Sequence, residues 1–154
     1  MPNHPANDDS PETRIARVAQ NHPEYAHEAY RYIANAVHVI AQEIQEQEAE
    51  SDPHAAKRHI SIAELLDGLR THLLKDFGRL AFDILGVWHV HTTADFGKIV
   101  YNLVEGGVLS LSPEDSIADF YNQYSFHKAF VAPFQYPNGD QASPWPVIDI
   151  LRKP

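Results

Sequence analysis

Residues 92–107 decide the fold, and they read Thr-Thr-Ala-Asp-Phe-Gly-Lys-Ile-Val-Tyr-Asn-Leu-Val-Glu-Gly-Gly. The large apolar side chains recur every three or four positions, as on one face of an α-helix: Phe96, Ile99, Val100, Leu103 and Val104. Thr92 and Thr93 are suited to cap a helix, and Asp95 places a negative charge in its first turn. The pair Gly106-Gly107 favours termination. The stretch therefore predicts an amphipathic helix over about 93–105.

Two further helices are predicted before this one. Ser61 and Glu64 have the spacing of a capping box, in which each side chain binds a free backbone amide of the first turn. The helix after them ends at Phe77-Gly78 and buries Ile62, Leu65, Leu66, Leu69 and Leu73. Gly68 within it indicates either the close approach of another backbone or a tolerated defect. A second helix is expected over about 79–87, with an apolar face made of Leu80, Ala81, Ile84, Leu85 and Trp88.

The N-terminal third also has helical patterns. Ser10 and Pro11 are a cap residue and a first-turn residue, so a short helix is predicted over about 11–20. A longer helix over 23–47 follows from apolar residues at spacings of three and four: Ala26, Tyr30, Ile33, Val37, Ile40 and Ile44. Residues 51–58 contain Asp52-Pro53 and are expected to form a surface linker.

The pattern changes after Gly107. Residues 108–111 read Val-Leu-Ser-Leu and are a candidate strand, and 112–115 read Ser-Pro-Glu-Asp, a helix start that leads to Phe120, Tyr121 and Tyr124. A small turn or helix is expected over 125–131. Prolines at 133, 137, 144 and 146 prevent regular structure beyond that point. Apolar residues in this last segment predict that it packs on its own core or on a partner: Trp145, Val147, Ile148 and Ile150.

Together these patterns predict a mainly α protein of five or six helices, with at most a short two-stranded element. The helices over 59–111 follow the order of a winged-helix or helix-turn-helix unit, and the long helix is expected to pack across it. We expect one domain overall. Its parts are a flexible tail (1–10), a helical arm (11–50), a linker (51–58), a helical core (59–131) and a proline-rich tail (132–154).

Composition narrows the classes of function. The chain has 154 residues, 44% of them hydrophobic, which is enough for a core without disulfides, and it contains no cysteine. No apolar run approaches the length of a membrane helix and no signal peptide is present, so we expect a cytoplasmic protein. With 21 acidic residues against 12 basic ones the net charge is −9, which makes nucleic acid an unfavourable partner.

Several motifs resemble those of a known family. They are Leu65–Arg70, Phe77-Gly78, Trp88 and above all Thr93–Glu105, followed by Gly107–Leu109 and Asp115–Phe120. Over roughly Glu24–Phe130 the chain is similar to an uncharacterised family restricted to Verrucomicrobia and Planctomycetes. The resemblance implies a bacterial source and no assigned activity. His89 is a departure, because a glycine often follows the tryptophan in that family.

Metal binding has to be considered, because the chain has ten histidines. His89 and His91 flank one residue in a predicted turn, and Asp95 could complete a site. No His-Glu-x-x-His or comparable spacing occurs, however, so these two are only weak candidates and no cofactor is expected.

Catalytic motifs are also missing. The sequence has no nucleophile elbow, phosphate-binding loop or dinucleotide fingerprint, so no catalytic residue is predicted and the balance is against an enzyme. Asp95, Asn102 and Glu105 are the polar residues singled out, either as functional groups or as structural ones. The structural role would be capping a helix for Asp95, and holding the Gly106-Gly107 turn for Asn102 and Glu105.

Two other functions remain in view. The helix order allows a transcription-associated DNA-binding protein, although Lys98 and Asn102 lie beside acidic residues on the third helix. Interaction with another protein, or with a second copy, is the leading hypothesis, as in an accessory subunit of a bacterial assembly. Its candidate interface is the cluster of aromatic residues in the last third: Tyr121, Tyr124, Phe126, Phe130, Phe134, Tyr136 and Trp145.

Overall fold

The computed structural model describes residues 9–135. They form five α-helices: α1 (Pro11–Asn21), α2 (His27–Ser51), α3 (Ile62–Phe77), α4 (Ala81–Val87) and α5 (Thr93–Glu105). Four short helical turns complete the chain: η1 (Gly78–Leu80), η2 (Ile117–Phe120), the π-helical η3 (His127–Val131) and η4 (Ala132–Phe134). Residues 9–135 contain no β-strand, so the prediction of a mainly α protein is confirmed.

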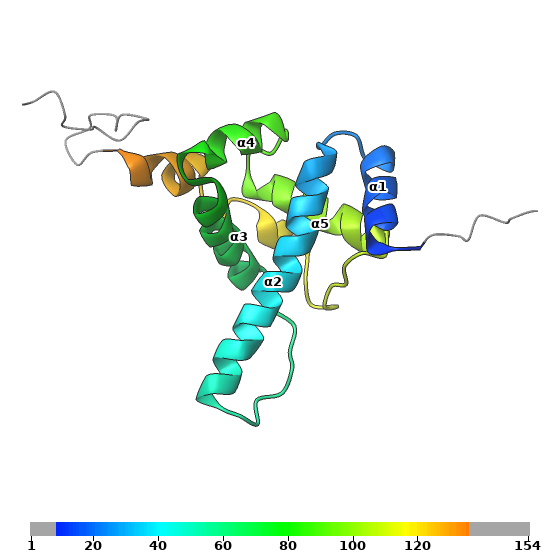
Figure 1. The fold of residues 1–154 in the computed structure, drawn as a ribbon, viewed down its shortest axis with the longest axis vertical. Helices are drawn as coiled ribbons and strands as arrows, with labels where there is room; N and C mark the ends of the chain where they lie inside the picture. The colour runs from blue at the N-terminus through cyan, green and yellow to red at the C-terminus, as the bar shows by residue number, and fades with distance from the viewer. Residues whose placement is uncertain (1–8, 136–154) are drawn as a thin grey trace, which may run out of the picture.

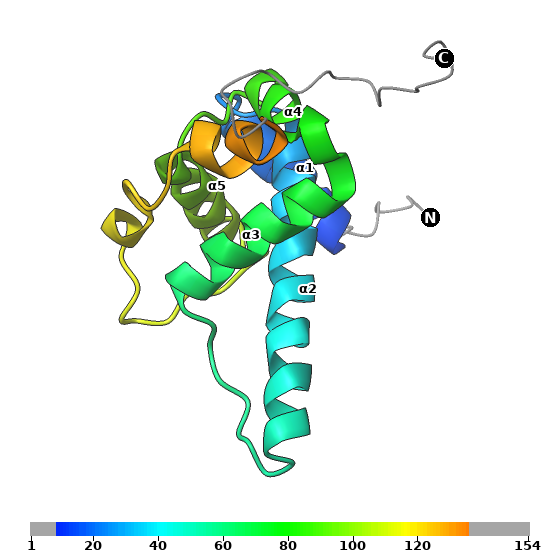
Figure 2. The same cartoon turned by 90° about the vertical axis from the view of Figure 1, so that its left-hand side faces the viewer.

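Helix α2 lies at the centre of the structure. It packs against α1, α3 and α5, and α3 crosses it on the side opposite α1 (Figure 1). The C-terminal half of α2 continues beyond the other helices, and the loop over 52–61 returns alongside it to the start of α3 (Figure 2). The packed half of α2 therefore organises the fold, while its other half forms a projection.

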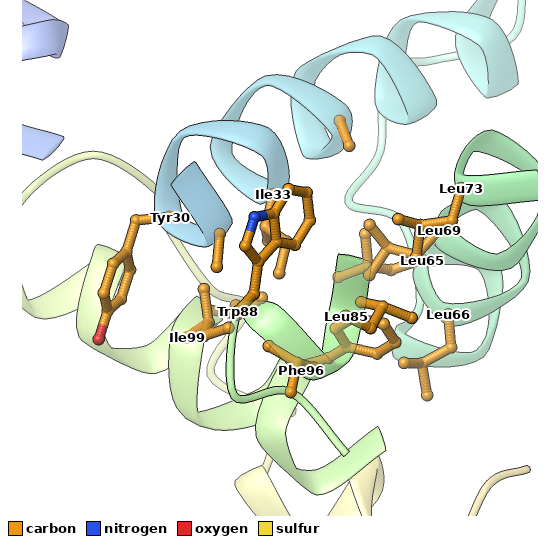
Figure 3. Close-up of a cluster of buried hydrophobic side chains, with 14 of the residues drawn as sticks. Tyr30, Ile33, Leu65, Leu66, Leu69, Leu73, Leu85, Trp88, Phe96 and Ile99 are labelled. Carbon is orange, nitrogen blue, oxygen red and sulfur yellow. The ribbon is translucent and has the colours of Figure 1, made fainter. Parts of the chain in front are cut away.

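One hydrophobic core joins all five helices, and Figure 3 shows part of it. Helix α2 contributes Tyr30 and Ile33, and α3 contributes its predicted row of leucines. Other labelled members come from α4, from the turn after it and from α5: Leu85, Trp88, Phe96 and Ile99. Residues far apart in the sequence thus share one interior.

The ends of α3 are as predicted. The Ser61 hydroxyl accepts a hydrogen bond from the Glu64 amide at 3.1 Å, and the Glu64 carboxylate accepts one from the Ser61 amide at 3.0 Å. Arg58 binds Glu64 and also Glu48 near the end of α2, which ties the returning loop to the projection. The Arg58 guanidinium and the Ser61 amide lower the pKa of Glu64 to about 2. The predicted capping box is confirmed.

The glycine inside α3 marks a close approach. A Cβ atom added at Gly68 would lie only 2.7–2.8 Å from three atoms of the Ile40 side chain, which is buried between α2 and α3. Of the two interpretations of Gly68, close packing is the one observed, and its partner is a side chain rather than a backbone.

Two predicted helix starts are wrong. Helix α2 begins at His27, not at residue 23, because the Tyr25 side chain is buried and the Ala26 amide donates to the carbonyl of Trp88. Before α4, residues 78–80 form a 3₁₀ turn, whose tighter winding shifts the helical phase. Leu80 is consequently 60% exposed instead of lying on the buried face.

The structure also differs from prediction after α5. No strand forms at residues 108–111, because the amides of Val108 and Leu109 bond back to the Leu103 carbonyl at the end of α5. Residues 112–115 form only a turn, in which Asp115 accepts from the Ser112 amide at 3.2 Å, and the 3₁₀ turn η2 follows. This part of the chain wraps α5 and buries Phe120 against Gly97.

Candidate functional site

Asp95 is the most heavily bonded of the predicted polar residues. One carboxylate oxygen accepts from the Tyr25 hydroxyl at 2.6 Å, and the other accepts from the amides of His91 and Thr92 at 2.8 and 3.1 Å. Burial raises the pKa of Asp95, but these three hydrogen bonds outweigh it and the pKa is lowered. Burial and the adjacent carboxylate raise the pKa of Tyr25. The arrangement caps α5 and fastens it to the turn before α2.

Asn102 and Glu105 have different surroundings. The Asn102 side-chain amide donates to the Tyr30 hydroxyl at 3.2 Å, and that hydroxyl donates to the His22 carbonyl at 2.8 Å. Burial raises the pKa of Tyr30 to about 12. The Glu105 side chain is 77% exposed and lies 3.9 Å from the His22 ring. Asn102 therefore links α5 to α2, whereas Glu105 is a surface residue.

The two candidate metal ligands lie in the turn between α4 and α5. Both His89 and His91 are exposed, and His89 has a backbone φ of 65° in the left-handed region. In the part of the chain that the structure describes, no three histidine or acidic side chains are grouped closely enough to hold a metal ion. The Asp95 oxygens are occupied by the contacts given above.

The predicted aromatic interface divides into buried and exposed members. Phe126 and Phe130 are buried with ring centroids 5.2 Å apart, and the Tyr124 hydroxyl donates to the Leu66 carbonyl at 2.9 Å. Burial raises the pKa of Tyr124. Tyr121 is 43% exposed, and Phe134 lies beneath the Arg79 guanidinium, 5.3 Å from it. The last two candidates, Tyr136 and Trp145, lie outside the described residues.

Tyr121 belongs to a pocket of about 620 Å³ at the start of α5. We call it the α5 pocket, and its walls include His91, Thr92, Lys98, Tyr121, Asn122 and Phe126. It lies where η2 and the segment after it meet α5. The structure thus brings together one candidate metal ligand and three candidate interface residues that the sequence placed in separate groups.

Phe134 belongs to a second depression, of about 340 Å³, between α4 and the turns η3 and η4. We call it the α4 groove, and its walls include Arg79, Phe82, Asp83, His127, Phe130 and Phe134. Phe82 is 42% exposed, and two other apolar side chains of the same region are more exposed still, Leu80 at 60% and Val87 at 73%.

Sequence analysis did not single out the residues of α4. The signal was present, because residues 80–88 are apolar at nearly every position and not on one face only. A helix that is apolar all round is either fully buried or covered by something else. Only Ala81 and Leu85 of α4 are fully buried, so the outward apolar side chains are a feature that the packing of residues 9–135 does not explain.

Two observations bear on membranes and relatives. Among the described residues, no helix combines the length and the apolar character needed to cross a bilayer. Comparison of the chain with protein-family models, curated proteins and solved structures finds no match. The resemblance of Thr93–Glu105 to a family therefore stays a prediction.

Proposed function

We propose that this protein is a non-enzymatic interaction module that holds a short apolar segment of another protein in the α4 groove. The observation that carries the proposal is the exposure of Phe82 of α4 at the groove, together with the exposure of Val87 in the same helix and of Leu80 in the preceding turn η1. Large apolar side chains that a domain leaves outside its core are typical of surfaces that bind partners.

The charges around the groove suggest the chemistry of the partner. Arg79 and His127 line it together with one acidic residue, Asp83. The formal charges of Arg79 and Asp83 cancel, so the groove lacks the excess of negative charge found in a chain with 21 acidic and 12 basic residues. A partner segment with two or three apolar side chains and an adjacent aspartate or glutamate would match the groove in shape and in charge.

The polar residues support a role without catalysis. Asp95 is bonded to Tyr25 and to two amides, and Asn102 is bonded to Tyr30, so both are used in holding helices together. The sequence resemblance implies a bacterial source, and we propose an accessory subunit of a cytoplasmic assembly. The DNA-binding alternative has no such support, because Asn102 is occupied and the exposed residues of α5 include Glu105 beside Lys98.

Selection of peptides tests the proposal without knowledge of the partner. The full chain is immobilised and presented with a phage library of random peptides, and the enriched peptides are synthesised and titrated by calorimetry. We expect enriched sequences that combine apolar residues with an acidic one. Phe82→Ser should weaken their binding by about tenfold or more, as expected for loss of an aromatic contact at the centre of an interface.

The matched control is Val39→Ser, which removes an apolar side chain of the same exposure (43%) from α2, away from the groove. It should leave peptide binding unchanged. No enrichment, or equal binding by the Phe82 and Val39 variants, would refute the proposal. Enriched peptides that reproduce Trp145–Leu151 would also refute it, because they would identify this chain, rather than another protein, as the occupant.

A further inference from the structure

We infer that the α5 pocket binds a small organic anion that carries a planar ring. This inference concerns a different surface from the α4 groove and does not depend on it. The volume of the α5 pocket, about 620 Å³, lies within the range of about 300–1,000 Å³ that is usual for pockets that bind small molecules. The chemistry of the walls then indicates which class of molecule fits.

Three polar wall residues are already used by the fold. The Thr93 hydroxyl accepts from the Gln123 amide at 3.2 Å, and the Ser125 hydroxyl accepts from the Lys128 amide at 3.1 Å. The Tyr124 hydroxyl donates to the Leu66 carbonyl at 2.9 Å. These contacts hold the segment after η2 against α3 and α5, and they give the pocket fixed walls.

Four other wall side chains have no hydrogen bond or ion pair within residues 9–135: His91, Lys98, Tyr121 and Asn122. The lysine can only donate, and the phenol, the amide and the imidazole each supply at least one donor. A set of free groups dominated by donors and containing a positive charge favours a ligand rich in acceptors, such as a carboxylate or a phosphate.

Negative charge does not oppose such a ligand at the wall itself. None of the pocket-lining residues is acidic. The carboxylate of Asp95 lies behind the wall with both oxygens bonded, to Tyr25 and to the amides of His91 and Thr92. The Lys98 ammonium interacts with this charge, which is one of the causes of the lowered Asp95 pKa, but forms no direct ion pair with it.

The aromatic walls account for the ring. Tyr121 is 43% exposed and Phe126 lines the floor of the pocket, although little of Phe126 is accessible. A planar group stacked on an exposed tyrosine gains more than an aliphatic chain of the same area, because offset aromatic pairs attract each other. A ring on Tyr121 with its anionic group at Lys98 would use both kinds of wall.

Titration of the full ¹⁵N-labelled chain tests the inference. The probes are adenosine 5′-monophosphate, phenyl phosphate and 4-hydroxybenzoate, with adenosine and inorganic phosphate as the two halves of the first probe. At least one ring anion should shift amide signals in residues 91–98 and 121–125. Its affinity should exceed that of either a ring or an anion alone by about tenfold, as expected for one charge-assisted contact.

Two variants separate a site from general attraction. Lys98→Met should weaken binding about tenfold, while Lys75→Met, which removes an exposed helical lysine outside the pocket, should leave it unchanged. Circular dichroism checks that both variants are folded. The inference would be overturned if none of the three ring anions shifts amide signals at about 10 mM, or if the two variants have equal effects. It would also be overturned if phosphate binds as tightly as the ring anions.

Discussion

Asp95 shows how one side chain supports several parts of this protein. It caps α5 and accepts a hydrogen bond from the buried Tyr25 hydroxyl. Removal of the Asp95 carboxylate therefore leaves both the start of α5 and the Tyr25 phenol without their hydrogen-bond partner. We expect Asp95→Ala to lower the free energy of unfolding by about 2–4 kcal/mol, measured by urea denaturation. Asp119→Ala is the control, because Asp119 caps the exposed turn η2 and should cost only about 0.5–1 kcal/mol. Equal costs would show that the Tyr25 contact contributes nothing.

His89 destabilises the protein through its backbone conformation. Its φ of 65° lies in a region that is unfavourable by roughly 1–2 kcal/mol for residues other than glycine. We expect His89→Gly to raise the free energy of unfolding by up to about 1 kcal/mol, since the greater freedom of glycine in the unfolded chain offsets part of the gain. Thermal denaturation measures this, and a lower melting temperature would mean that the imidazole makes a stabilising contact.

These two residues mark what local sequence reveals. Thr92 as a cap residue and the negative charge of Asp95 in the first turn predicted a helix start, because such residues act within their own turn. The same reasoning could not find Tyr25, which is 70 residues distant, or the φ of His89. His91 drew attention as a histidine near a carboxylate, yet it is the His91 backbone amide that binds Asp95.

Among whole elements, two of the helical glycines, in α3 and α4, should respond in opposite ways to replacement by alanine. A Cβ atom added at Gly68 in α3 would lie 2.7–2.8 Å from the Ile40 side chain, whereas one added at Gly86 in α4 would have no neighbour within 4 Å. Gly86→Ala should stabilise the protein by about 0.5–1 kcal/mol through helix propensity. Gly68→Ala should destabilise it by about 1–3 kcal/mol, because Ile40 and its helix must move. Chemical denaturation of both variants checks the signs, and stabilisation by both would mean that α2 and α3 separate easily.

The accuracy of each predicted element depends on whether local residues or tertiary contacts determine where it begins and ends. Helices α3 and α5 end at glycines and begin at capping residues, so the sequence predicted their bounds closely. The start of α2 depends instead on Tyr25 and on the Trp88 carbonyl, which are tertiary contacts. Residues 108–115 have the composition of a strand and a helix start, but the amides of Val108 and Leu109 bond to the end of α5, and Ser112 and Asp115 bond to each other in a turn.

For the molecule as a whole, we expect acid to lower the free energy of unfolding, because it weakens the contacts of two carboxylates. The pKa values of Asp95 and Glu64 are lowered in the folded state, Glu64 to about 2 from 4.5. Groups of this kind stabilise fully above their unfolded pKa, and the contribution is lost as the pH falls through the folded pKa. Denaturation at pH 7, 4 and 2.5 should show falling stability, and the advantage over Glu64→Gln should shrink between about pH 4.5 and 2. A difference in the free energy of unfolding that does not change with pH would mean that Glu64 stabilises the protein through its packing and hydrogen bonds rather than through its charge.

The whole-molecule arrangement was only partly predictable. A mainly α protein of this size follows from the helical periodicity of the apolar residues. The packing of the long helix across the helices over 59–111 was predicted, and α2 does contact α3 and α5. The sequence does not show that α1 also packs on α2, which places α2 at the centre. The exposure of Leu80 was not predicted, because the 3₁₀ turn before α4 shifts the helical phase there.

The loop over 52–61 has a consequence for how the protein could be taken apart. The helices before this loop and those after it share one hydrophobic core. Arg58, near the end of the loop, donates a hydrogen bond to Glu48 of α2. Neither piece can satisfy its own apolar face. Two separately expressed fragments, divided between Pro53 and Lys57, should therefore find each other and restore the fold, which would make this chain a natural candidate for a split reporter.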